Sequence, residues 1–211
     1  IFTMNDYVFN PGFIFLFSVP IALILPLVWR RIFLVVVPIL VLFYIVGLDV
    51  KSIQTTTFLF YDFILLRVDK LSVIFGYIFC IAASISNIFS FHQDDRLQDT
   101  STIIYTGSAL GAVFVGDLIS LFVFWELTAV SSVFLIWCAR NEHSFSAGIR
   151  YLVIHIGSGV ILLAGIIIWI NSNSVISFND IGINSLGGKL IFLAFGIKCA
   201  FPLLHNWLQD S

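Results

Sequence analysis

The sequence predicts an all-α protein, a polytopic bundle of about seven transmembrane helices in which the seventh helix is broken near Lys198 and Pro202. The first observation behind this prediction is composition. Of the 211 residues, 60% are hydrophobic, the mean hydropathy is +1.07, and only 10 Lys or Arg and 12 Asp or Glu residues are present. These values exclude a soluble globular domain. The second observation is that apolar residues fall into seven runs suited to a hydrocarbon core about 30 Å thick.

The N-terminal part of the chain holds two predicted spans. The first covers 11–29, contains Pro26, and is expected to stop at the dibasic pair Arg30–Arg31. The second covers 32–48. Prolines are accepted in membrane helices when neighbouring groups satisfy the freed carbonyls. The two spans are therefore assigned on either side of the arginine pair.

Residues 49–70 are less apolar and rich in β-branched and aromatic side chains around a turn candidate at Tyr61–Asp62. This pattern predicts an extracytoplasmic, hairpin-like loop. The third span follows at 71–91. The charged linker 92–100 behind it is interpreted as a solvated loop.

The fourth span, 102–115, is the shortest and weakest apolar run. It carries Gly107 and Gly111, a spacing of small residues that lets helices approach closely. The chain then turns at Gly116–Asp117 into the fifth span, 118–138. Asp117 is expected to cap that helix.

The last two spans are 151–170 and 186–204, separated by a polar loop. The whole chain, 1–211, is interpreted as a single incomplete membrane domain. Basic residues divide five against four between alternate loops, which weakly favours an extracytoplasmic N-terminus in a cell (inner) membrane. The two groups are Arg30, Arg31, Arg96, Arg140 and Arg150 on one side, and Lys51, Arg67, Lys70 and Lys189 on the other.

Glu126 is a carboxylate within the fifth span. At about 1.5 Å per residue it lies roughly 13 Å from the start of the helix, near the middle of the bilayer. An acid at that depth costs about 2.5–3.5 kcal/mol and usually has a partner or serves an ion path. The structural alternative is a hydrogen bond to Ser or Thr hydroxyls, and Thr128, Ser131 and Ser132 lie on the same helix.

Lys198 lies within the seventh span, and Pro202 follows four residues later. Proline lacks an N–H group and its ring presses on the carbonyl four residues before it, so the helix is predicted to break at Lys198. Broken helices recur at ion sites in transporters. A lysine that extends its amine to the membrane surface is the alternative. Glu126 and Lys198 at similar depth would hold a proton when close and release it on separation, a step of proton translocation.

His155 and His205 are candidate proton relays, because imidazole titrates near neutral pH. For His155 the alternative is a hydrogen bond across helices. Trp207 is interpreted as an anchor at the membrane surface. Haem ligation by the two histidines is disfavoured, since ligands at opposite depths would not face one haem. No cofactor or metal site is predicted. The three cysteines are interpreted as buried small residues: Cys80, Cys138 and Cys199. The absence of a basic surface argues against nucleic acid as a partner.

Three segments resemble helices five, six and seven of the proton-translocating antiporter-like subunits: DLISLFVFWELTAVSSVFLIW, GIRYLVIHIGSGVILLAG and LIFLAFGIKCAFPLLHNWLQDS. Mrp-type Na+/H+ antiporters, whose D-type subunits are the most similar, share this family with NADH:quinone oxidoreductase. VDKLS at 68–72 is similar to the family's entry to its third helix. The resemblance implies that Glu126 and Lys198 are the pair that gates proton movement, with His205 and Trp207 ending the broken helix.

The resemblance also implies a whole protein of about fourteen helices in two inverted repeats, of which this chain supplies only the N-terminal half. Gln209 replaces a proline usual in the family, and a truncated product, half of a split gene and a fragment stay open. The predicted function is an ion-translocating subunit of the cation/proton antiporter type. It would work in the lipid bilayer with other subunits and move protons and a cation such as Na+. The alternatives are a proton-pumping subunit of NADH:quinone oxidoreductase and a non-transporting fragment. The chain is interpreted as a transport subunit rather than an enzyme.

Overall fold

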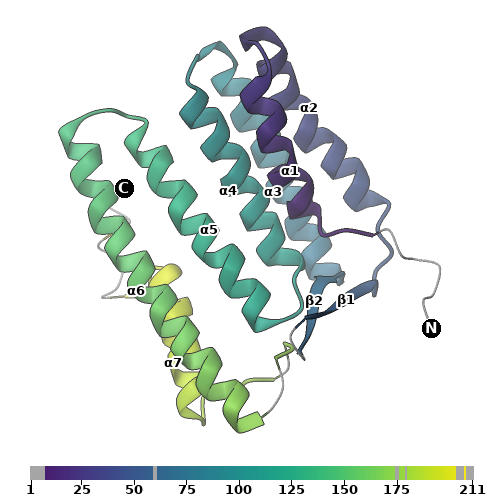
Figure 1. Ribbon diagram of the computed structural model, residues 1–211, viewed down its shortest axis with the longest axis vertical. Coiled ribbons are helices and arrows are strands. Elements are labelled where there is room, and N and C mark those ends of the chain that lie inside the picture. The colour runs from purple at the N-terminus through teal and green to yellow at the C-terminus, as the bar shows by residue number, and fades with distance from the viewer. Residues whose placement is uncertain (1–7, 59–60, 174–175, 179, 203–206, 208–211) are drawn as a thin grey trace.

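A computed structural model describes residues 8–58, 61–173, 176–178, 180–202 and 207. Within them it shows seven α-helices and one two-stranded hairpin, which confirms the predicted all-α bundle (Figure 1). The elements are α1 (Pro11–Ile24), α2 (Leu27–Val46), β1 (Ile53–Phe58), β2 (Tyr61–Arg67), α3 (Lys70–Phe89), the 3-10 turn η1 (Ser90–His92), α4 (Arg96–Phe114), α5 (Leu118–Trp137), α6 (Glu142–Asn173) and α7 (Leu186–Lys198).

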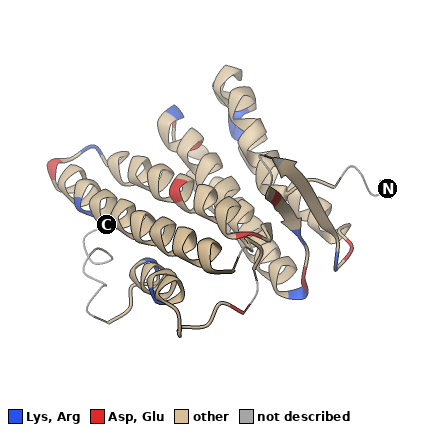
Figure 2. Cartoon of the chain, turned by 60° about the horizontal axis from the view of Figure 1, so that its bottom comes forward, with Lys and Arg blue, Asp and Glu red and all other residues tan. Residues whose placement is uncertain are grey.

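Four of the described helices are long and apolar enough to cross a membrane: α2, α3 together with η1, α5 and α6. Helix α1 is apolar but shorter. Most charged residues lie at helix ends or in the connections between helices (Figure 2). This distribution is typical of a bundle whose middle lies in hydrocarbon.

The boundary between α1 and α2 differs from the prediction. Helix α1 ends at Ile24, and Arg30 and Arg31 lie inside α2 rather than between two spans. Pro26 causes the difference, because a proline disfavours helical backbone at the residue before it. Leu25 is accordingly extended, with ψ 138°.

Arg30 is tolerated inside a helix because two carboxylates neutralise it. Its side chain is only 2% exposed, and it donates to Asp99 Oδ2 at 2.7 Å and to Asp94 Oδ1 at 2.8 Å. Arg140, just after α5, pairs with Asp95 at 2.6 Å. The linker before α4 was predicted to be a solvated loop, and this is only partly correct, since the Asp99 side chain is 13% exposed. The contacts bring one end of α2, α4 and α5 together.

Two helices extend beyond their predicted ranges. Helix α4 begins at Arg96, six residues before the predicted span, because Asp95 accepts hydrogen bonds from the backbone of Leu97 and Gln98. Helix α6 begins at Glu142 and continues to Asn173. A prediction based on apolar runs alone does not include these extensions, because the residues at the helix ends are polar.

The predicted hairpin is present, with β1 and β2 antiparallel. The predicted turn at Tyr61–Asp62 is wrong, because Tyr61 begins β2 and pairs with Phe58. Aromatic and β-branched residues favour strand on both sides of this position, so propensity alone could not place the turn.

Asp117 joins the hairpin to the start of α5 at the opposite end of the bundle from Arg30. Its carboxylate accepts from Ser120 N at 2.7 Å, which confirms the predicted helix cap. It also accepts from Ile64 N in β2 at 2.9 Å, and the side chain is fully buried. Backbone bonds from Gly116 to Ile64 and from Leu118 to Ile176 reinforce the junction.

We expect Asp117→Ala to lower the free energy of unfolding by about 1–3 kcal/mol, because two buried N–H groups lose their acceptor. Asp69→Ala is the matched control. Asp69 caps α3 in the same way, but its side chain is 49% exposed, so water can replace the lost oxygen. Chemical unfolding in mixed micelles measures both changes. Equal losses for the two variants would contradict the role assigned to the hairpin contact.

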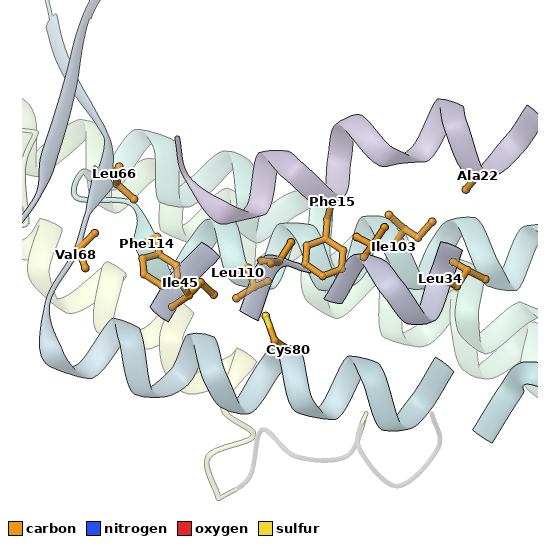
Figure 3. Packing of buried hydrophobic residues seen from close by; sticks show 12 residues of the cluster. Phe15, Ala22, Leu34, Ile45, Leu66, Val68, Cys80, Ile103, Leu110 and Phe114 are labelled. Atoms are coloured by element: carbon orange, nitrogen blue, oxygen red, sulfur yellow. The ribbon is translucent and has the colours of Figure 1, made fainter. Parts of the chain in front are cut away.

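The N-terminal helices and the hairpin enclose one buried apolar cluster (Figure 3). Its members include Phe15, Ile45, Leu66, Cys80, Leu110 and Phe114. Helices α1 and α4 approach closely at Gly12, where an added Cβ would overlap the backbone of Gly107 and Gly111. The close approach predicted from the glycine spacing is therefore confirmed. In a bilayer such packing stabilises by van der Waals contact rather than by exclusion of water.

Candidate functional site

Helix α7 ends at Lys198, as the position of Pro202 predicted. Ala200 adopts a left-handed conformation with φ 53°, and Phe201 N donates back to Gly196 O at 2.9 Å. This pattern is a common way to close a helix. The lysine therefore stands at the end of a helix inside the bundle.

The Lys198 ammonium is held by helix α5. It donates to the carbonyl oxygen of Trp125 at 2.8 Å, and it lies 4.4 Å from the centroid of the Trp125 ring. A cation over an indole face gains about 0.5–2 kcal/mol. The same carbonyl also accepts from Thr128 Oγ1 at 2.9 Å. The structure thus directs the amine into the protein, against the alternative in which it extends to the membrane surface.

Glu126 lies on α5 next to Trp125, and one of its carboxylate oxygens, Oε1, is buried. Among the described residues this atom has no hydrogen-bond partner. It packs against Gly159 of α6, where an added Cβ would overlap it. The hydroxyls of Thr128 and Ser131 donate to carbonyls of their own helix. The structural alternative of a hydroxyl-bonded carboxylate is therefore not supported.

Glu126 and Lys198 lie near each other without forming an ion pair. In the described part of the chain no oxygen of Glu126 is within 4.0 Å of the lysine nitrogen, but the lysine binds the residue directly before the glutamate. The carboxylate faces α6 and the ammonium faces α5, so neither points into lipid.

His155, on α6, is 1% exposed. Its two ring nitrogens lack hydrogen-bond partners among the residues that the structure describes, so the alternative of a bond across helices finds no support there. The ring packs 4.0 Å from that of Tyr151 and 4.5 Å from that of Trp207. A buried imidazole normally has a hydrogen-bond partner, so this arrangement is unusual.

Trp207 does not act as the predicted surface anchor. It is half-buried, its indole nitrogen donates to Ile197 O at 3.1 Å, and its ring covers His155 and Tyr151. His205, the other predicted relay, lies outside the described residues. Cys199 is exposed and Cys138 is half-buried, so of the three cysteines predicted to be buried only Cys80 is.

Three residues of the site were not singled out from the sequence: Trp125, Tyr151 and Gly159. Tyr151, His155 and Gly159 follow one another at intervals of four, which places them on one face of a helix. From that spacing, Tyr151 and Gly159 could have been placed on the same helix face as His155. Tyr151 also accepts a hydrogen bond from Ser132 Oγ at 2.8 Å, which ties α6 to α5.

Residues 115–211 match a family described as NADH:quinone oxidoreductase/Mrp antiporter, transmembrane region. The match contains α5, α6 and α7 and therefore every residue of the site. The C-terminal part of the chain is thus similar to this family. This similarity agrees with the resemblance found in the sequence, and four of the described helices are long and apolar enough to cross a bilayer.

Proteins that are similar to this chain include antiporter subunits. The putative antiporter subunit mnhA2 of Staphylococcus saprophyticus is 35% identical over 122 residues, which cover 52% of this chain and 15% of that protein. The D-type subunit of the Na+/H+ antiporter of Bacillus subtilis is 24% identical over 164 residues, covering 70% of this chain and 33% of that protein. The chain thus spans a third or less of these relatives.

A solved structure shows the same fold. One chain of the Mrp complex from a Dietzia species superposes with a TM-score of 0.78 over 95% of the present chain and 25% of the Dietzia chain. The sequences are 19% identical. At this identity the likeness concerns the arrangement of helices.

Proposed function

We propose that this chain is an ion-translocating subunit of the cation/proton antiporter type, in which proton movement depends on Glu126 and Lys198. One observation carries the proposal. The two opposite charges lie side by side in the bundle and are not paired, since the ammonium rests on the carbonyl of Trp125. A proton switch requires two positions for the ammonium, one on the carbonyl and one on the carboxylate.

In the proposed cycle the Lys198 ammonium moves between these two positions. Contact with Glu126 favours the protonated amine, because opposite charges stabilise each other. Return to the neutral Trp125 carbonyl removes that stabilisation, and the proton can leave. His155 has two ring nitrogens without partners in the described structure and is proposed as the group that exchanges this proton. His205 is proposed as a second relay by its place in the sequence.

The proposed transporter works with other polypeptides. Its relatives are named as subunits of antiporters, and the Bacillus subtilis relative is named for Na+ and H+. We therefore propose partner subunits, protons and Na+ for this chain as well. We also propose that the N-terminus and the hairpin lie outside the cell, and the end with Arg30 and Arg140 inside.

The decisive experiment is proton movement in vesicles that contain the chain with its partner subunits. We expect Glu126→Gln and Lys198→Ala each to lower the initial rate about 10²-fold, the effect expected for removal of a proton-transferring group. Matched controls are Glu142→Gln and Lys189→Ala, which change exposed residues and should leave the rate unchanged. A pH-sensitive dye inside the vesicles reports the rate. Full activity in both site variants would refute the proposal.

The second candidate is a proton-pumping subunit of NADH:quinone oxidoreductase, which the family description names beside the antiporters. An antiporter moves protons in response to an imposed Na+ gradient. A respiratory complex moves them only during electron transfer from NADH to quinone. If the assembly moves protons neither with an imposed Na+ gradient nor during electron transfer, and Glu126→Gln changes nothing, the chain is a non-transporting fragment.

A further inference from the structure

The rings of Tyr151 and Trp207 contact His155 from two directions. The imidazole ring lies 4.0 Å from the Tyr151 ring and is tilted by 31° to it, so the two rings are nearly face to face. The Trp207 ring contacts the imidazole at 4.5 Å and 78°, an edge-to-face arrangement. Tyr151 and Trp207 also contact each other, at 5.4 Å and 79°. We call these two residues the aromatic clamp.

Each ring of the aromatic clamp is anchored at its polar end to another helix of the site. Tyr151 Oη accepts a hydrogen bond from Ser132 Oγ of α5 at 2.8 Å. Trp207 Nε1 donates to the carbonyl oxygen of Ile197, near the end of α7, at 3.1 Å. The clamp therefore connects the imidazole on α6 to the two helices that carry the opposite charges of the site.

Ring contacts replace the hydrogen bond that usually orients a buried histidine. In most such residues one ring nitrogen bonds to a fixed partner, and this bond decides which nitrogen carries the proton. His155 is 1% exposed, yet neither Nδ1 nor Nε2 has a partner in the described part of the chain. Tyr151 and Trp207 thus set the position of the imidazole while both of its nitrogens stay available.

We propose that the aromatic clamp positions His155 to take up a proton at one ring nitrogen and to release a proton from the other. Neutral imidazole carries one proton, so uptake at the free nitrogen gives an imidazolium with two. Release from the opposite nitrogen restores neutral imidazole as the other tautomer, and one proton has crossed the ring. Tyr151 and Trp207 are positioning residues in this step. The inference rests on the proposed function, in which His155 exchanges the proton of Lys198.

Variants of Tyr151 test the role of its ring. In vesicles that contain the chain with its partner subunits, Tyr151→Leu should lower the initial rate of proton uptake about 10²-fold, because displacement of a reacting group by about 1 Å can cost that much. Tyr151→Phe keeps the ring and loses the hydroxyl, so it should cost at most about tenfold, the equivalent of one neutral hydrogen bond. Ser132 Oγ is then still within reach of the carbonyls of Thr128 and Ala129, so its hydroxyl keeps an acceptor.

Variants of two neighbouring serines test the anchor. Ser132→Ala should resemble Tyr151→Phe, and the double variant should lose no more than either single variant, since each removes the same bond. Ser131→Ala is the matched control, because this hydroxyl donates to Leu127 O and Thr128 O of its own helix. It should leave the rate unchanged. Additive losses in the double variant would contradict the anchor.

Nuclear magnetic resonance of the full chain in lipid bilayers tests the clamp without transport. The chain contains four histidines, so comparison with His155→Asn assigns the signals of His155 after labelling with nitrogen-15. Both tautomers should be present in the unaltered chain, because neither nitrogen has a fixed partner. The carbon-bound protons of the imidazole should be shifted by the ring current of Tyr151. This shift should persist in Tyr151→Phe and disappear in Tyr151→Leu.

The two experiments separate failure of the clamp from failure of the proposed function. A single tautomer of His155, or a ring-current shift that survives Tyr151→Leu, would overturn the clamp. So would normal transport in Tyr151→Leu when Glu126→Gln is inactive. Full transport in Glu126→Gln would refute the proposed function instead, and the resonance spectra would then decide whether the clamp holds His155 with both nitrogens free.

Discussion

Replacing Gly159 by alanine is expected to stop proton movement almost as completely as the loss of Glu126 itself. A Cβ at position 159 would overlap Oε1 of Glu126 and crowd its carboxyl carbon, so the carboxylate must leave its place between α5 and α6. Displacement of a reacting group by about 1 Å can cost 10²-fold in rate. The measurement is the initial rate of proton uptake in vesicles.

Gly157→Ala is the matched control for this prediction. Gly157 lies on the same helix, and an added Cβ there meets no atom within 4 Å. Transport should be unchanged, and stability should rise by about 0.5–1 kcal/mol because glycine is unfavourable inside helices. Combining Gly159→Ala with Glu126→Gln should cause little further loss, since both act on one group. Glu126→Asp, which is shorter by one methylene group, should partly restore activity in Gly159→Ala. Normal transport in Gly159→Ala would show that the position of the carboxylate does not matter.

The second large effect concerns stability. Arg30→Met is expected to lower the free energy of unfolding by about 3–5 kcal/mol, because Asp99 is left as a buried charge without its partner. The Arg30 side chain is 2% exposed and that of Asp99 is 13% exposed. Unfolding in mixed micelles, followed by circular dichroism, measures the change.

Arg31→Met is the control, because Arg31, at the neighbouring position, is only half-buried and bonds only to backbone carbonyls. It should cost less than about 1 kcal/mol. Adding Asp99→Leu to Arg30→Met should recover much of the loss, since removal of both partners of a buried pair is often nearly neutral. A small effect of Arg30→Met, or no recovery in the double variant, would mean that the pair does not hold α2 to α4.

Much of the site could be predicted from the sequence because few polar residues occur in the membrane segments. Glu126, Lys198 and His155 are conspicuous in such surroundings, and Pro202 predicts where α7 ends. The residues that shape the site were less visible. Gly159 and Trp125 belong to types that are common in membrane helices, and their importance comes from what lies opposite.

Local chemistry, read from the sequence alone, determined that this protein is a membrane bundle, where most helices lie, and which charged residues stand at depth. Hydropathy and the missing N–H of proline act within a few residues, so their effects can be read in order along the chain. Only the tertiary structure decided that Arg30 lies inside a helix, that Lys198 rests on Trp125 and that Glu126 packs on Gly159. These are contacts between helices, and they depend on the faces that packing brings together.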